Sequence, residues 1–140
     1  MNVVTRISPH ADSPGATASA SASSYAEQGI WQWQGEFPLH HGGSLPHLRI
    51  GWRLAGAADA PVVAALGGIS AHRRVFDTQS SGEGWWSEAV GPGRALDSSR
   101  LRVLGIDYLG ASGESTGPAH GGAFPSLSSF DQAEAQELEP

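Results

Sequence analysis

Two glycine-rich segments contain most of the residues that could do chemistry. The first is Gly67-Gly68-Ile69-Ser70-Ala71-His72, and the second runs from Asp107 to Pro118. Each follows a short apolar run, and in an open α/β sheet ligands bind at the carboxyl ends of the strands. Glycines in such a loop let the main chain come close to a bound group. We therefore expect the chemistry of the protein to be located at these two loops.

The runs that precede these loops predict two parallel strands. Val62–Leu66 is continuously apolar and Leu101–Ile106 nearly so, which is typical of strands covered on both faces by helices. The interval between them is long enough for the crossover that parallel strands require. Upstream, Ile30–Gln34 and Leu48–Leu54 alternate with period two. These two segments predict an antiparallel pair that precedes the parallel strands.

A helix is expected near the end of the sequence. Ser128 and Asp131 have the spacing of a helix-capping pair. Phe130, Ala133 and Leu138 recur at roughly helical spacing, which predicts that they share the buried face.

Composition narrows the class of protein. With 8 Lys+Arg against 14 Asp+Glu, the net charge of -6 leaves no basic surface for nucleic acid or anionic lipid. There is no cysteine, so disulfides and thiolate metal sites are excluded. No stretch has the apolar length of a membrane span or the character of a secretory signal. The expected location is the cytoplasm.

The first part of the chain differs in character from the rest. Residues 1–28 form a Ser/Ala/Pro-rich tail with few large apolar side chains, which cannot offset the entropy lost on ordering. We expect this tail to be disordered and a single domain to occupy residues 29–140.

The most specific motifs lie between Gly84 and Pro118. They read Gly84-Trp85-Trp86, Gly91-Pro92-Gly93-Arg94-Ala95-Leu96-Asp97, Asp107-Tyr108-Leu109-Gly110 and Gly113-Glu114-Ser115-Thr116-Gly117-Pro118. In these motifs the chain resembles the N-terminal part of the homoserine O-acyltransferases (O-acetyl- and O-succinyltransferases), α/β-hydrolase-fold enzymes of methionine biosynthesis. The resemblance implies an incomplete α/β fold, the N-terminal portion of an α/β hydrolase, with antiparallel N-terminal strands leading into a parallel sheet.

The resemblance also implies roles for the first glycine-rich loop. In α/β hydrolases the loop after the corresponding strand supplies a backbone N–H of the oxyanion hole. Gly68, Ile69 and Ser70 are the oxyanion and substrate-binding candidates, with Ile69 in place of the family's Leu and Ser70 in place of its Thr. No G-x-S-x-G nucleophile elbow is expected within the chain. The Ser, Asp and His of the triad are expected beyond Pro140, so the chain alone is expected to be inactive.

The implied reaction transfers an acyl group from acetyl-CoA or succinyl-CoA to the hydroxyl of homoserine. Acyl-CoA would be a co-substrate, no bound cofactor or metal is implied, and a homodimer of the full-length protein is left open. Two alternatives remain. One is an esterase or other hydrolase of the same fold, because fold does not fix the acceptor. The other is a non-catalytic truncated product, or an interaction module that uses its unpaired sheet.

Other candidate residues have structural interpretations. Asp107 and Glu114 could be a carboxylate pair, although acids in a glycine-rich turn are more often caps and turn ligands. The six histidines lack the i, i+4 pairing and third ligand of a zinc site, so no metal is expected. Trp85 and Trp86 are interpreted as a packing anchor, with a pocket lining as the alternative.

Overall fold

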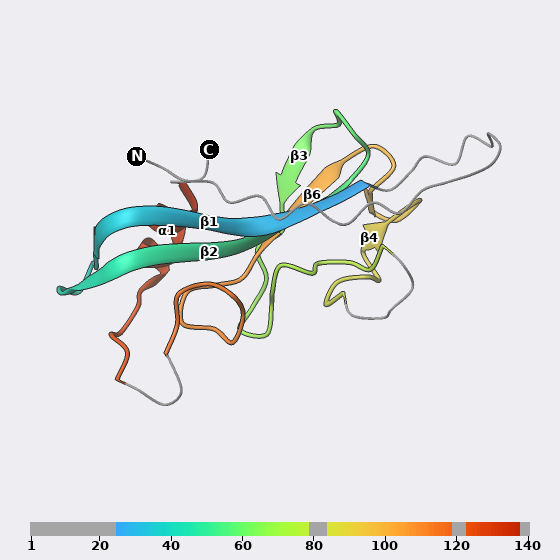
Figure 1. The fold of residues 1–140 in the computed structure, drawn as a ribbon. Helices are drawn as coiled ribbons and strands as arrows, with labels where there is room; N and C mark the ends of the chain where they lie inside the picture. The colour runs from blue at the N-terminus through green and yellow to red at the C-terminus, as the bar shows by residue number, and fades with distance from the viewer. Residues whose placement is uncertain (1–24, 79–83, 119–122, 138–140) are drawn as a thin grey trace.

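A long antiparallel hairpin forms one side of the sheet. The computed structural model describes residues 25–78, 84–118 and 123–137. Strands β1 (Tyr25–Pro38) and β2 (Ser44–Gly56) pair along almost their whole length (Figure 1). The predicted antiparallel pair is confirmed, and β1 begins earlier than the expected start at Gly29. Residues 1–24 of the tail lie outside the described residues.

The hairpin leads into a parallel pair. Strands β3 (Val62–Ala64) and β6 (Arg102–Ile106) are parallel, and the four-stranded sheet has the order β1-β2-β6-β3. The crossover between them contains a small second sheet of β4 (Val90–Gly91) and β5 (Leu96–Asp97). Antiparallel strands leading into parallel ones are the arrangement that the sequence predicts.

The expected covering of β3 on both faces is wrong. Val62 is 54% exposed and Leu66 60% exposed. Within the described residues β3 is the edge strand, paired on one side only by β6. The continuous apolar run Val62–Leu66 therefore contains a strand, Val62–Ala64, but the described part of the chain leaves Val62 and Leu66 more than half exposed.

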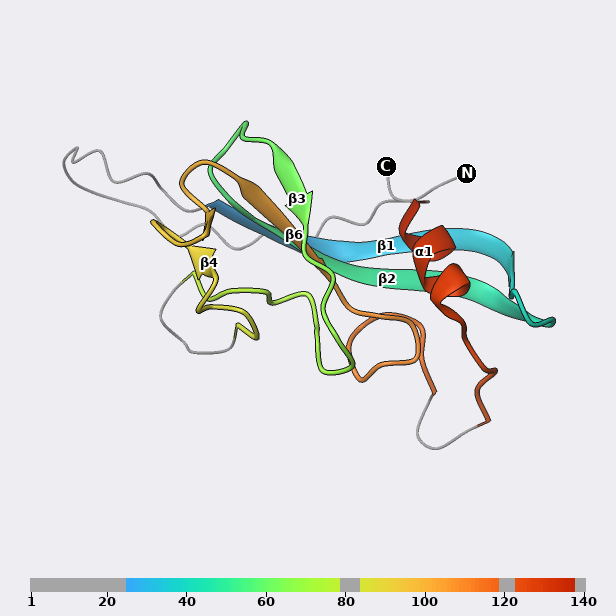
Figure 2. The ribbon, with the colours of Figure 1, turned by 180° about the vertical axis from the view of Figure 1, so that it is seen from behind.

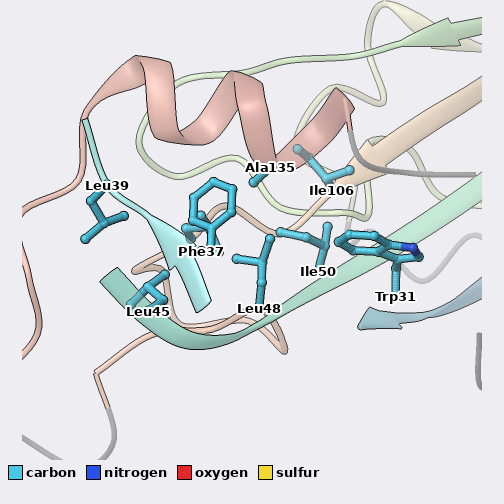
Figure 3. Packing of buried hydrophobic residues seen from close by; sticks show 9 residues of the cluster. Trp31, Phe37, Leu39, Leu45, Leu48, Ile50, Ile106 and Ala135 are labelled. Carbon is cyan, nitrogen blue, oxygen red and sulfur yellow. The ribbon is translucent and has the colours of Figure 1, made fainter. Parts of the chain in front are cut away.

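Apolar side chains gather on both faces of the sheet. On one face, residues of β1, β2, β6, the helix α1 (Ser129–Glu137) and the adjoining loops form a cluster made of Trp31, Phe37, Leu39, Leu45, Leu48, Ile50, Ile106, Leu109 and Ala135 (Figure 3). The opposite face carries Ala55 and Val103, which the crossover covers with Val75, Phe76 and Val90. Figure 2 shows α1 and β4 at opposite ends of the hairpin.

The helix begins as predicted, but its buried face differs. The Ser128 hydroxyl accepts the N–H of Asp131 at 3.2 Å, and the Asp131 carboxylate accepts the Ser128 N–H at 2.6 Å, which is a reciprocal cap. Phe130 is 65% exposed and Ala133 is exposed, while Asp131 and Ala135 are buried; Leu138 lies outside the described residues. No helix in the described residues is long and apolar enough to cross a membrane.

Polar side chains decide this orientation of the helix. Asp131 accepts the His40 N–H at 2.7 Å from the turn of the β1–β2 hairpin. Gln132 bonds both main-chain groups of Leu109, at 3.0 and 2.9 Å. The first turn of α1 therefore holds the hairpin turn and the start of the loop after β6 together.

Low pH should weaken the contact between α1 and the hairpin turn, because it protonates the Asp131 carboxylate. Burial acts to raise the pKa of this carboxyl, but the N–H groups of Ser128 and His40 and the Ser128 hydroxyl outweigh burial and hold the pKa below its ordinary value. A lowered folded-state pKa stabilises the fold at pH above the unfolded value of about 3.9, and the contribution disappears as the pH falls through the folded pKa.

We therefore expect the free energy of unfolding to fall below about pH 4 and Asp131→Asn to remove part of that dependence. Denaturant unfolding followed by circular dichroism at a series of pH values measures it. Glu134→Gln, at an exposed position of the same helix, is the control. An unchanged pH dependence in Asp131→Asn would contradict the role of this carboxylate.

Candidate functional site

The first glycine-rich loop forms a turn that leaves two N–H groups free. After β3 the Ala65 N–H still bonds the Leu104 carbonyl, and the loop then turns with the Ala71 N–H donating to the Gly68 carbonyl at 2.9 Å. Ile69 and Ser70 lie at the corner and both are exposed, Ile69 completely. No described residue accepts a hydrogen bond from the N–H of either one. The turn therefore presents main-chain donors at the carboxyl end of a parallel strand.

Both ends of this turn are fixed. The Tyr108 hydroxyl donates to the Gly67 carbonyl at 3.0 Å, and the Trp85 indole N–H donates to the His72 carbonyl at 2.7 Å. The indole of Trp85 also packs on Gly67, where a Cβ would lie 2.6 Å from the ring and 2.5 Å from the Ala71 methyl. At Gly68 a Cβ would have no atom within 4 Å. The turn is thus tightly held at Gly67 and open at Gly68.

The second glycine-rich loop continues the sheet where β6 ends. The Asp107 N–H donates to the Gly51 carbonyl at 2.8 Å, and the Gly51 N–H donates to the Ser115 hydroxyl at 2.9 Å. Further along β2, the Arg49 N–H bonds the Thr116 hydroxyl at 2.8 Å and the Thr116 N–H bonds the Arg49 carbonyl at 2.9 Å. This loop therefore satisfies the main-chain groups of β2 that β6 does not reach.

An ion cluster joins the two loops. Asp107, 4% exposed, accepts the Arg73 N–H at 2.9 Å and the Glu114 N–H at 3.1 Å. The Arg73 guanidinium lies 3.7 Å from the Asp107 carboxylate and pairs with the carboxylate of Glu114. The two acids are thus turn ligands and partners of Arg73, in agreement with the structural interpretation of this pair. Sequence reasoning missed Arg73, because no local pattern marks an arginine that pairs 34 residues away.

Ser115 lies in a segment that has the spacing of a nucleophile elbow. Gly113-Glu114-Ser115-Thr116-Gly117 has the letters of a G-x-S-x-G elbow, so the pattern does occur in the chain. The Ser115 side chain is buried, donates to the Asp107 carbonyl and accepts the Gly51 N–H. A nucleophile elbow exposes its serine at a strand-to-helix turn. Ser115 instead lies in a loop and uses its hydroxyl to hold β2, so it is not an elbow.

The two tryptophans have different environments. Their rings stack with centroids 5.6 Å apart and an interplanar angle of 4°. Trp85 packs against the buried cluster of Val75, Phe76 and Val90, which fits the interpretation as a packing anchor. Trp86 is 42% exposed, so the anchor consists mainly of Trp85.

The histidines are dispersed. His72 bonds the Arg74 N–H at 3.2 Å, and the His40 ring stacks on Phe130 at 4.6 Å in the hairpin turn region. His10 and His120 lie outside the described residues. Within the described ranges, no three His, Cys, Asp or Glu side chains gather in a way that could hold a metal ion.

Comparison with solved structures shows the class of fold. A homoserine O-acetyltransferase from Staphylococcus aureus matches with a TM-score of 0.70 at 23% identity, over 81% of this chain and 34% of that one. Esterase E22 matches with a TM-score of 0.64 at 19% identity, over 81% of this chain and 36% of that one. The chain therefore has the fold of part of an α/β hydrolase.

Sequence comparison identifies the relatives. No protein-family model matches the chain. A homoserine O-succinyltransferase from Xanthomonas campestris pv. campestris is 41% identical over 99 residues, covering 70% of this chain and 24% of that protein. A serine O-succinyltransferase from Frateuria aurantia is 35% identical over 88 residues, covering 59% and 24%. The chain is similar to part of these O-succinyltransferases, and it spans about a quarter of their length.

Alanine substitutions at Gly67 and Gly68 should differ in their effect on stability, because only Gly67 is closely packed. Gly67→Ala forces a methyl group into the Trp85 ring and Ala71, and overpacking of this kind costs about 1–3 kcal/mol of unfolding free energy. Gly68→Ala meets no atom and should stay within about 0.5 kcal/mol. Urea unfolding followed by tryptophan fluorescence compares them. Equal stabilities would contradict the close packing of Trp85 on the turn.

Proposed function

We propose that this chain forms one wall of an acyl-transfer site of the homoserine O-acyltransferase type. The site would move an acyl group from a coenzyme A thioester to the side-chain hydroxyl of a small amino acid in methionine biosynthesis, in the cytoplasm. The observation that carries the proposal is the turn Gly68–Ala71, whose free N–H groups lie at the carboxyl end of β3. The relatives named homoserine and serine O-succinyltransferase support acyl transfer as the reaction.

The chemistry explains why a free N–H at this place is useful. When a nucleophile attacks a thioester carbonyl, the carbonyl oxygen becomes an oxyanion, and the carbon–sulfur bond then breaks to release the thiol. A fixed main-chain donor stabilises that charge without reorganisation. We assign the donor role to the N–H of Ile69, flanked by Gly68 and Ser70. The described residues contain no exposed serine in an elbow, so the proposal gives this chain the oxyanion donor and the pocket wall and no nucleophile.

The acceptor and the acyl donor are the finer parts of the proposal. Homoserine as acceptor follows the Xanthomonas relative, while the Frateuria relative names serine. Both are small amino acids with a side-chain hydroxyl, so both belong in the assay. Succinyl-CoA is the first donor to test, with acetyl-CoA beside it. A homodimer of the complete gene product stays a prediction.

A chimera tests the proposal. The aligned segment of the Xanthomonas homoserine O-succinyltransferase is replaced by the aligned residues of this chain, and thiol release from succinyl-CoA is measured with homoserine or serine present. We expect hydroxyl-dependent turnover. In that chimera Ile69→Pro removes the donor and should lower kcat by about 10²–10³-fold, whereas Ile69→Val should be nearly silent.

The unmodified relative is the reference for turnover, and circular dichroism confirms that each variant is folded. A folded chimera without hydroxyl-dependent turnover would refute the proposed function. Equal kcat values for the folded Pro and Val variants would refute the assignment of Ile69 alone.

A further inference from the structure

The carboxylate of Asp107 lies where it can control the first glycine-rich turn. Arg73 follows that turn directly, and its N–H donates to Asp107 at 2.9 Å. The preceding carbonyl, of His72, is held by Trp85 at 2.7 Å. Two consecutive main-chain groups at the end of the turn are therefore fixed, one by a packed indole and the other by a buried charge.

Glycines confine this carboxylate to one position. At Gly51 a Cβ would lie 2.7 Å from the carboxylate oxygen, and at Gly113 it would lie 2.5 Å from the same oxygen. The Arg73 carbonyl packs equally closely on Gly105 of β6. Any side chain at these three places would displace either Asp107 or Arg73. The close packing leaves the carboxylate little freedom to move.

The guanidinium of Arg73 lies beside this carboxylate. A buried carboxylate without a partner is costly, and Arg73 with Glu114 completes a cluster in which each charge has a partner. Glu114 is half exposed and also donates its N–H to Asp107 at 3.1 Å. The second loop therefore stabilises the carboxylate that holds the first.

We propose that Asp107 is a positioning residue for the proposed acyl-transfer site: it sets the place of the Ile69 donor by fixing Arg73 at the end of the turn. The expected effect of Asp107 on turnover rests on the proposed function. Its expected effect on the position of the turn does not. Asp107 touches no reacting atom in this scheme.

The test uses the chimera with the Xanthomonas homoserine O-succinyltransferase, carrying Asp107→Ala, Asp107→Asn or the control Asp59→Asn. Asp59 is exposed and has φ 60°, a conformation that Asn also adopts, so this control changes the charge equally. Hydrogen exchange measures the Arg73 amide and the turn, and steady-state kinetics with succinyl-CoA and homoserine or serine measure kcat and KM.

We expect exchange of the Arg73 amide to become at least about 10-fold faster in Asp107→Ala, because its acceptor is lost and the turn opens locally. We expect kcat to fall by about 10²-fold with little change in KM, since a small displacement of a catalytic donor has that cost. Asp107→Asn keeps one acceptor oxygen and should restore part of both losses. Asp59→Asn should match the chimera that carries the unsubstituted segment.

The outcomes are distinguishable. Unchanged exchange at Arg73 and the turn in Asp107→Ala would overturn the proposal, as would faster exchange with unchanged kcat in an active protein. Absence of acyl transfer in the chimera that carries the unsubstituted segment would instead refute the proposed function, and the exchange measurement would still decide whether Asp107 fixes the turn. Where Asp107→Ala does not fold, Asp107→Asn carries both measurements.

Discussion

The buried carboxylate of Asp107 is the constraint on which the arrangement of the two loops depends. A charge in this position must be matched by donors, and it receives the N–H groups of Arg73 and Glu114 together with the Arg73 guanidinium. These partners come from the crossover and from the loop after β6. Satisfying one carboxylate therefore brings together two segments that are distant in the chain.

The packing around Asp107 and Arg73 explains three glycines and a serine for which the neighbouring sequence gives no reason. Gly51 and Gly113 lie against the carboxylate, and Gly105 lies against the main chain of Arg73. None of the three has a positive φ, so the close approach of neighbouring atoms, and not backbone conformation, requires glycine there. Ser115 holds β2 through its hydroxyl at the same junction. These glycines and Ser115 look in the sequence like ordinary turn residues, but in the structure they pack around an ion cluster.

Features that depend on local periodicity could be predicted from the sequence, and those that depend on distant partners could not. The alternation in Leu48–Leu54 and the apolar run in Leu101–Ile106 predict strands, because each side chain pattern matches a sheet face. The cap at Ser128 is equally local. The buried face of α1 could not be predicted in this way, since the hydrogen bond from the His40 N–H to Asp131 joins residues 91 apart in sequence.

In the candidate site, too, local features could be predicted from the sequence and long-range contacts could not. A glycine pair after an apolar run predicts the turn at Gly67–His72, and in the structure this turn follows β3 with free N–H donors. The hydrogen bonds through which Trp85 and Arg73 fix the end of this turn could not be predicted, because the sequence does not show which residues of the crossover contact each other or Asp107. The G-x-S-x-G letters around Ser115 show the converse, since a motif without its strand-to-helix context has a structural role.

A double-mutant cycle between Arg73 and Asp107 tests most directly whether the two loops are held as one unit. Arg73→Met keeps the apolar stem and removes the charge, and Asp107→Asn keeps the shape of the carboxylate. The unfolding free energies of both single variants and the double variant give the coupling. We expect a favourable coupling of about 0.5–3 kcal/mol, so that the double variant loses less unfolding free energy than the sum of the two single variants. Losses that add to within about 0.3–0.5 kcal/mol would contradict it.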